Sequence, residues 1–196
     1  MSPLADVGLF LFHSLATLYL VVLLLRFALP LVRADFRNPV CQFVHRATWP
    51  LLAPLRRFVP GLGRLDPSPL LAALFVEWLA IQLAASLVYD AGLLDPLRVL
   101  LWGALGLLSL ALSCYYYGVL AVVILSWVAP HSGHPAARLL WRLMEPVMAP
   151  FRRILPPLAG VDLSPILLFV VLNMFRILLG HAARAAQVPA GIVPGI

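Results

Sequence analysis

The side chains best suited to chemistry are two arginine doublets and the aspartate that follows each of them: Arg56, Arg57 and Asp66, then Arg152, Arg153 and Asp162. A further acidic residue, Glu145, precedes the second doublet. Guanidinium groups bind phosphate and carboxylate oxygens through paired hydrogen bonds, so this set indicates a surface for anionic lipid or a partner protein. The same residues could instead only turn the chain, with each aspartate paired to its own doublet.

Catalysis is not indicated by the sequence. No nucleophile with a neighbouring base, cluster of metal ligands or phosphate-binding loop is recognisable, so we expect no enzyme, metal or cofactor. The two cysteines, Cys41 and Cys114, are far apart and outside any CxxC pattern. We interpret them as two small, partly buried thiols.

The composition is that of a membrane protein. Of the 196 residues, 63% are hydrophobic and only 11% are charged, whereas a soluble domain is about half apolar and about a quarter charged. Four stretches are long and apolar enough to cross a bilayer: about Val7 to Leu31, Pro69 to Val88, Leu100 to Val128, and Pro165 to Ala183. We therefore predict an all-α protein with four transmembrane helices, because an open sheet edge cannot lie in hydrocarbon.

The chain contains two copies of one unit, related by a shift of 96 residues. Twelve positions between Pro39 and Leu70 are identical to their counterparts in the second copy: Pro39, Arg46, Pro50, Ala53, Pro54, Arg56, Arg57, Pro60, Leu62, Asp66, Ser68 and Pro69. For example, Pro156 and Leu158 are the counterparts of Pro60 and Leu62. Repeat 1 covers residues 1–95 with a motif loop at 33–68, and repeat 2 covers 96–196 with a motif loop at 130–164. Each unit has two spans, so both motif loops lie on the same side of one membrane domain, as parallel repeats.

The basic residues predict which side that is. Net charge is +6 with no lysine, and ten arginines fall in the motif loops: Arg33, Arg37, Arg46, Arg56, Arg57, Arg64, Arg138, Arg142, Arg152 and Arg153. Only Arg98 and Arg184 lie toward the other side. The positive-inside rule predicts that the motif loops lie in the cytoplasm and that both termini lie outside. Arginines set between apolar runs face anionic headgroups, so we expect no direct nucleic-acid binding.

Each motif loop is predicted to begin with a short amphipathic helix in the membrane interface. Asn38 can cap the first helix with Pro39 at its first position, while Ser132 or Gly133 would cap the second less well. The apolar positions are Val40, Phe43, Val44, Ala47 and Leu51, then Ala136, Leu139, Leu140, Leu143 and Val147. The helix is expected to be about three turns long, because the proline pairs Pro50/Pro54 and Pro146/Pro150 would break or kink it. Ser68 and Ser164 are expected to cap the following spans.

Four polar side chains fall inside the apolar spans and are functional candidates: Arg26, Glu77, Asn173 and Arg176. In the second copy, Val122 and Asn173 replace Arg26 and Glu77, so both charges are absent together. This joint absence predicts an ion pair between Arg26 and Glu77. Arg176 either meets Glu77 across the repeats, lines a wet cavity or simply snorkels along the bundle.

The motifs resemble those of the YggT family of integral membrane proteins over nearly the whole chain. Both copies contain Asn-Pro or His-Pro, then P-x-x-x-P-x-R-R, then D-x-S-P, between two spans. The family usually has an acidic residue before the second proline of the motif, which is Pro50 in the first copy and Pro146 in the second. Glu145 retains this acidic residue, whereas Trp49 replaces it. The resemblance implies an inner-membrane protein. It implies links to osmotic stress and potassium uptake, to cell division and nucleoid distribution, or, through plastid relatives, to assembly of a haem-bearing cytochrome b subunit.

We therefore expect a membrane adaptor or assembly factor, linked to osmotic stress tolerance or to organisation of the cell envelope or division. The alternative is an oligomeric ion channel or an accessory subunit for potassium uptake, for which the four intramembrane polar residues would be the only lining. The expected partners are anionic lipid headgroups and an unidentified membrane or cytoplasmic protein, and a homo-oligomer stays open.

Overall fold

The structure is a computed structural model of the chain. It describes residues 3–59, 61, 65–89, 94–129, 132–155, 162–189 and 191–196, with side chains from residue 7 onward except at Tyr89. Five positions used in the sequence argument lie outside the described residues: Pro60, Leu62, Arg64, Pro156 and Leu158.

The described part of the chain is helical throughout its regular elements, as the sequence predicts. Six helices follow one another: α1 (Pro3–Leu31), α2 (Pro39–Leu55), α3 (Ser68–Tyr89), α4 (Pro96–Val128), α5 (Pro135–Ile154) and α6 (Ser164–Ala185). Four of them, α1, α3, α4 and α6, are long and apolar enough to cross a membrane. The predicted four-span, all-α fold is confirmed.

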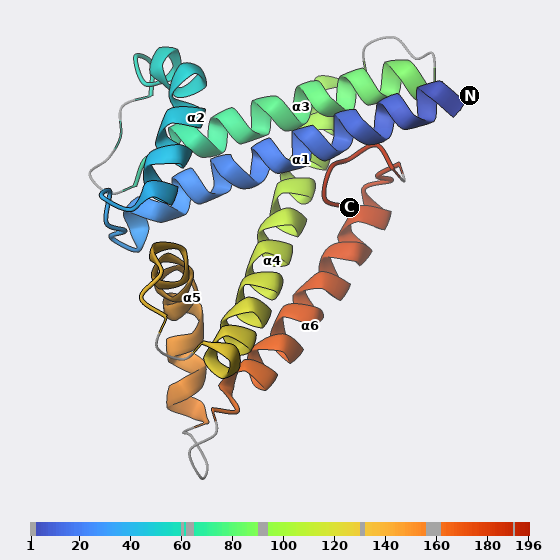
Figure 1. Cartoon of the computed structure of the whole chain (residues 1–196). Coiled ribbons are helices and arrows are strands. Elements are labelled where there is room, and N and C mark those ends of the chain that lie inside the picture. The colour runs from blue at the N-terminus through green and yellow to red at the C-terminus, as the bar shows by residue number, and fades with distance from the viewer. Residues whose placement is uncertain are drawn as a thin grey trace.

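The helices form two hairpins that share one arrangement (Figure 1). In the first, α1 packs on α3 and the short helix α2 lies between them in the chain; α4, α6 and α5 repeat this pattern. Both short helices gather at one end of the molecule, while the two chain termini lie toward the opposite end (Figure 1). The motif loops therefore share one end, which we call the motif face.

Side chains in the preceding loops start the helices of the motif face. Asn38 accepts a hydrogen bond from the amide of Val40 (2.9 Å), as the sequence predicts. In the second copy the cap is His134, whose Nδ1 accepts from the amide of Ala136 (3.2 Å), and not Ser132 or Gly133. The correction has a simple cause: His134 is the repeat counterpart of Asn38, and its ring nitrogen can accept like the Asn38 side-chain oxygen.

The proline pairs do not end the short helices as predicted. α2 continues through Pro50 and Pro54 to Leu55, and α5 continues through its own pair to Ile154. All four prolines are exposed on the motif face, and prolines four residues apart share one side of a helix. Because that side is exposed, water or headgroups can satisfy the carbonyl groups that lose their amide partners.

The buried side of the short helices is also shifted from the predicted one. In α2 the buried residues are Cys41, Val44, Thr48 and Leu52, while Phe43 is exposed. In α5 they are Ala137, Leu139, Leu143, Met144 and Met148. Apolar side chains on these helices face two different surroundings, the bundle and the lipid boundary, and the sequence does not distinguish them. The predicted stripe mixed the two faces.

The two hairpins are joined by the contact of α3 with α4. Gly103 and Gly106 of α4 let α3 approach closely, and the fully buried side chain of Glu77 occupies the space over them. Residues 191–196 fold back over the same place, with Ile192 and Val193 buried and the Gly195 carbonyl accepting from the Ser109 hydroxyl (2.7 Å). We call residues 191–196 the C-terminal cover.

Candidate anion-binding face

Repeat 1 ends its motif with an ion pair that also starts α3. Arg56 pairs with Asp66 through its guanidinium group. The other oxygen of Asp66 accepts from the amide of Ser68 (3.1 Å), and the Ser68 hydroxyl donates to the carbonyl of Val59 (3.2 Å). Asp66, rather than the predicted Ser68, therefore supplies the acceptor at the start of α3, because the serine hydroxyl is turned back toward the preceding turn. We call this set the clasp.

Repeat 2 builds the same clasp at positions 96 residues later. Arg152 Nε donates to Asp162 (3.0 Å), and Asp162 accepts from the amide of Ser164 (2.9 Å). The Ser164 hydroxyl donates to the carbonyl of Leu155 (3.2 Å), which is the counterpart of Val59. The pairing of each aspartate with its own doublet, one of the two sequence interpretations, is thus present in both copies.

The two clasps differ in the third group that holds the arginine. In repeat 2 the Arg152 guanidinium also pairs with Glu145 (2.8 Å). In repeat 1 the counterpart of Glu145 is Trp49, and the Arg56 guanidinium carbon lies 5.9 Å from the centre of its ring. A cation–π contact therefore takes the place of the second carboxylate, so the departure from the family pattern keeps the arginine in position.

Only one arginine of each doublet is engaged in this way. Among the described residues Arg57 and Arg153 form no ion pair, and both are exposed. The clasp thus uses five of the predicted binding residues for structure: Arg56, Asp66, Glu145, Arg152 and Asp162. Arg57 and Arg153 are left to face the surroundings, together with basic side chains elsewhere on the motif face.

The clasps are electrostatically favoured in their ionised form. Burial acts to raise the pKa of Asp66 and of Asp162, but hydrogen bonds from the neighbouring arginine and serine outweigh it, so each pKa lies below its ordinary value. Burial, reinforced by Arg26 and Arg56, lowers the pKa of His45, whose ring stacks on Trp49 at 5.4 Å. Its surroundings therefore disfavour the charged form of this histidine.

The repeats contact each other through the starts of their short helices. The Asn38 amide donates to the carbonyl of Pro135 (2.7 Å), and Arg142 donates to the carbonyl of Arg33 (3.0 Å). Arg33 has a left-handed backbone (φ 53°), in the turn that follows α1. A side chain of each repeat thus bonds the backbone of the other, and a cleft remains between them.

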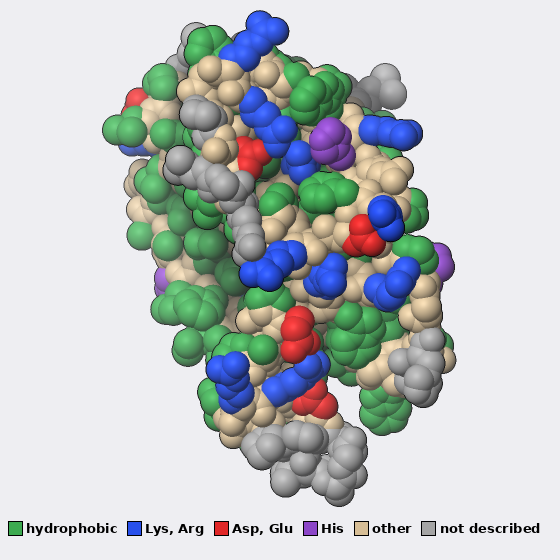
Figure 2. Space-filling view, turned by 90° about the vertical axis from the view of Figure 1, so that its left-hand side faces the viewer, with side chains coloured by type: hydrophobic (Ala, Val, Ile, Leu, Met, Phe, Trp, Pro, Cys, Tyr) green, Lys and Arg blue, Asp and Glu red, His purple; other side chains and the backbone are tan. Residues whose placement is uncertain are grey.

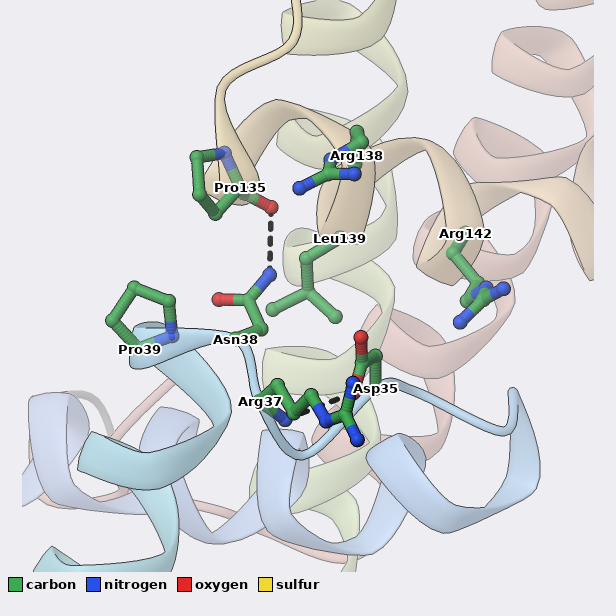
Figure 3. Close-up of a pocket in the computed structure, with 8 residues that line it drawn as sticks. All are labelled: Asp35, Arg37, Asn38, Pro39, Pro135, Arg138, Leu139 and Arg142. Atoms are coloured by element: carbon green, nitrogen blue, oxygen red, sulfur yellow. Dashed lines mark hydrogen bonds between the residues drawn. The ribbon is translucent and has the colours of Figure 1, made fainter.

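This cleft of about 320 Å³ is the basic site of the motif face. It is lined by residues from both repeats: Asp35, Arg37, Asn38 and Pro39, with Pro135, Arg138, Leu139 and Arg142 (Figure 3). Three arginines against one aspartate, which itself accepts from the Arg37 amide (2.9 Å), leave the cleft positively charged. The starts of α2 and α5 add their partial positive charge. Figure 2 shows arginine side chains spread over this end of the molecule.

This cleft was not predicted from the sequence. Arg37, Arg138 and Arg142 were interpreted only as loop charges, and the binding surface was predicted at the doublets. The available signal was the pair of cap-proline sequences, Asn38-Pro39 and His134-Pro135. Those sequences predict two helix starts, but only the contact between the repeats brings them together.

The four intramembrane polar residues are not brought together. The predicted Arg26–Glu77 pair is wrong: neither carboxylate oxygen of Glu77 has a hydrogen-bond partner in the described part of the chain. Glu77 points instead toward Gly103 and Gly106, whereas Arg26 is buried within electrostatic reach of Arg56 and Asp66. The two side chains lie at different levels of α3: Arg26 is near Asp66, just before the helix begins, whereas Glu77 is further along the helix, against α4.

The second pair of intramembrane residues lies on the outside of α6. Arg176 is exposed, and its guanidinium carbon lies 5.3 Å from the centre of the Tyr116 ring, so it does not meet Glu77. Asn173 is exposed as well, and its amide donates to the carbonyl of Phe169 in the same helix (3.0 Å). In a single chain the four residues therefore do not line one common path.

The architecture defines a multi-pass helical membrane protein built from two parallel hairpin repeats. The sequence profile of the CCB3/YggT family matches the chain twice, at residues 5–87 and 101–183, and the chain belongs to this family. The two matches coincide with the two hairpins.

Relatives cover almost the full length. The chain is 42% identical over 179 residues to an uncharacterised protein of Pseudomonas aeruginosa, covering 91% of this chain and 90% of the relative. It is 34% identical over 193 residues to the uncharacterised protein YggT of Escherichia coli K12, covering 95% of each. An uncharacterised protein of Vibrio alginolyticus is 35% identical over 171 residues, covering 87% of this chain and 92% of the relative. No solved structure matches the chain.

Proposed function

We propose that this protein is an inner-membrane adaptor or assembly factor whose motif face lies in the cytoplasm and binds anionic groups. The observation that carries the proposal is the inter-repeat cleft, where Arg37, Arg138 and Arg142 converge between two helix starts. Such a site suits the phosphate of an acidic headgroup or a carboxylate of a partner protein. The processes implied by the family resemblance are osmotic stress tolerance and organisation of the cell envelope or division.

The clasps support this role because they fix the motif face against the membrane spans. Each clasp ties the end of a short helix to the start of the next span, so α2 and α5 are held in place at the boundary. Exposed Phe43 and Trp49 can enter the lipid boundary from the same helix. A rigid, basic platform at the membrane surface is what an adaptor requires.

Lipid retention tests the cleft. Protein in nanodiscs of mixed phosphatidylglycerol and phosphatidylcholine is analysed by native mass spectrometry, and wild type is expected to keep phosphatidylglycerol preferentially. The variant Arg37→Gln/Arg138→Gln/Arg142→Gln should lose that preference by at least about tenfold, since each charge-assisted contact contributes about 1 kcal/mol or more. If the preference is unchanged, the cleft is not the site.

A matched control removes the same charge elsewhere: Arg57→Gln, Arg98→Gln and Arg153→Gln. All three arginines are exposed, and none forms an ion pair among the described residues. This variant should retain the lipid preference. An equal loss in both variants would mean that bulk charge, rather than the cleft, selects the lipid.

Partner capture and ion flux separate the adaptor from the channel. A photocrosslinker at position 138 should capture the same protein from native membranes in repeated experiments, whereas one at position 97, at the opposite end, should not. Vesicles containing the purified protein should show no added potassium or proton flux. Robust flux that Glu77→Ala abolishes would overturn the adaptor and establish the ion-transport alternative.

A further inference from the structure

One face of α6 carries an amide within an exposed apolar stripe. Ile166, Val170, Asn173 and Ile177 follow one another at intervals of four, three and four residues, so they form a stripe along the helix. All four side chains are exposed, Ile177 to 62%. An amide at the centre of a lipid-facing stripe is unfavourable, and in transmembrane helices such groups gather at helix–helix contacts. We call this set the α6 stripe.

The same stripe in repeat 1 is half-buried at Leu70 and Leu74 and fully buried in its second half. Its counterparts 96 residues earlier include Glu77 and Ile81, which are both 0% exposed. They are covered because this side of α3 packs on α4: a Cβ at Gly103 would lie 3.1 Å from Glu77 Cγ and 3.8 Å from Ile81 Cδ1. The partner of α3 is thus the first helix of the following repeat. Residues 1–196 contain no further hairpin after α6 against which the α6 stripe could pack.

The surface of α4 that packs on α3 has a counterpart on α1, and this counterpart is exposed. Gly103, Leu107 and Leu110 of α4 are buried where α4 meets α3 and its neighbours. Their counterparts on α1 are Val7, Leu11 and Ser14, which are all exposed. Leu11 is 54% exposed, whereas Leu107 is 7% exposed. We call this set the α1 stripe.

We propose that the α6 stripe of one copy packs on the α1 stripe of a second copy, in the way that α3 packs on α4 inside the chain. The contact continues an interface that the fold already contains, with the second copy providing the missing repeat. The side-chain sizes fit such a change of partners: Asn173 is smaller than Glu77, and Val7 is larger than Gly103. A head-to-tail contact of this kind closes into a ring when the rotation between units closes.

Cysteine crosslinking tests the register directly. A Cβ at Gly103 would lie 3.6 Å from Glu77 Cβ, within the range of a disulfide, so their counterparts Val7 and Asn173 should be equally close between copies. In a background with Cys41→Ala and Cys114→Ala, Val7→Cys and Asn173→Cys are placed in differently tagged chains and co-expressed. Mild oxidation of the membranes should produce a band of twice the mass that carries both tags, limited to the interfaces that pair one variant with the other.

Matched variants decide between the possible outcomes. Val7→Cys with Ile177→Cys should crosslink less than the first pair, because Ile81, the counterpart of Ile177, reaches Gly103 only with the tip of its side chain, which a cysteine lacks. Val7→Cys with Phe175→Cys should not, because its counterpart Leu79 stays 46% exposed on α3. Asn173→Cys crosslinked only to itself would reveal a symmetric α6–α6 contact and overturn the proposal. So would a monomeric mass for the wild-type protein released from membranes in native mass spectrometry.

Discussion

The aspartate of each motif does two jobs with one carboxylate. Asp66 binds Arg56 with one oxygen and the amide of Ser68 with the other, so it joins the end of the motif to the start of a transmembrane helix. Asp162 does the same in the second copy. The two sites differ in burial, since the Asp66 side chain is 15% exposed and that of Asp162 is 36% exposed. Solvent therefore weakens the second clasp more than the first.

Changing the first aspartate should destabilise the protein more than changing the second. Asp66→Asn is expected to cost about 1–3 kcal/mol, because a partly buried arginine loses its carboxylate. Asp162→Asn should cost about 1 kcal/mol or less, as exposed ion pairs do. Thermal unfolding in detergent micelles measures both, with Arg57→Gln as the control that leaves the clasps intact. Equal losses would contradict the ranking.

The difference in stability between wild type and Asp66→Asn should depend on pH. A carboxylate whose pKa is lowered by folding stabilises the protein above its unfolded pKa, and this contribution is lost as the pH falls through the folded value. The gap in stability between wild type and Asp66→Asn should therefore be constant from pH 8 to pH 5. It should shrink below about pH 4. A gap that widens on acidification would mean that the carboxylate is not the stabilising form.

Trp49 and Glu145 occupy equivalent positions in the two repeats, and each contacts the arginine of its own clasp by a different interaction. Trp49→Glu should therefore be tolerated within about 1 kcal/mol, because a carboxylate at this place can pair with Arg56 as Glu145 pairs with Arg152. Trp49→Ala should lose more, since it removes the cation–π contact and the stacking on His45. Thermal unfolding of both variants checks this order.

At the scale of the elements, glycines on α4 decide how closely the two hairpins approach. A Cβ at Gly106 would fall against Glu77, and it would lie 2.6 Å from Val193 Cγ1 and 3.0 Å from the Pro194 carbonyl. The C-terminal cover would have to move. At Gly118 the obstacle is the flexible Met144 side chain, and at Gly180 nothing lies within 4 Å.

Alanine at these three positions should therefore give a graded series. Gly106→Ala is expected to cost about 1–3 kcal/mol through overpacking, Gly118→Ala less, and Gly180→Ala close to nothing. Thermal unfolding in micelles gives the ranking. A cysteine placed at Val193 should also become reactive to maleimide when Gly106→Ala is present. If it stays protected, the cover has not moved.

At the scale of the whole molecule, the parallel repeat places both motifs on one end. Cysteines at positions 57 and 153, in the background lacking Cys41 and Cys114, should both react with an impermeant maleimide from the same side of the membrane. A cysteine at Leu97, exposed at the start of α4, should react from the other side. The charge distribution predicts that the first pair is cytoplasmic. Reaction of 57 and 153 from opposite sides would contradict the fold.

Much of this fold could be predicted because it is local. Apolar runs set the spans, cap residues such as Asn38 set helix starts, and the 96-residue shift reveals the repeat. The features that were wrong or missed depend on packing between distant segments. Whether Pro50 ends α2 depends on which side is exposed, and the surroundings of Glu77 depend on glycines of α4 and on residues 191–196. The cleft exists only where Asn38 meets Pro135.

The cover over Glu77 has a consequence for biosynthesis. α3 leaves the ribosome while α4 is still being completed, and Val193 and Pro194 are translated long after both. During that interval the Glu77 side chain faces lipid or the insertion machinery, where a neutral carboxyl costs far less than a carboxylate. The nascent hairpin therefore enters the bilayer before Glu77 has the surroundings of the finished fold, and translation of residues 191–196 completes them.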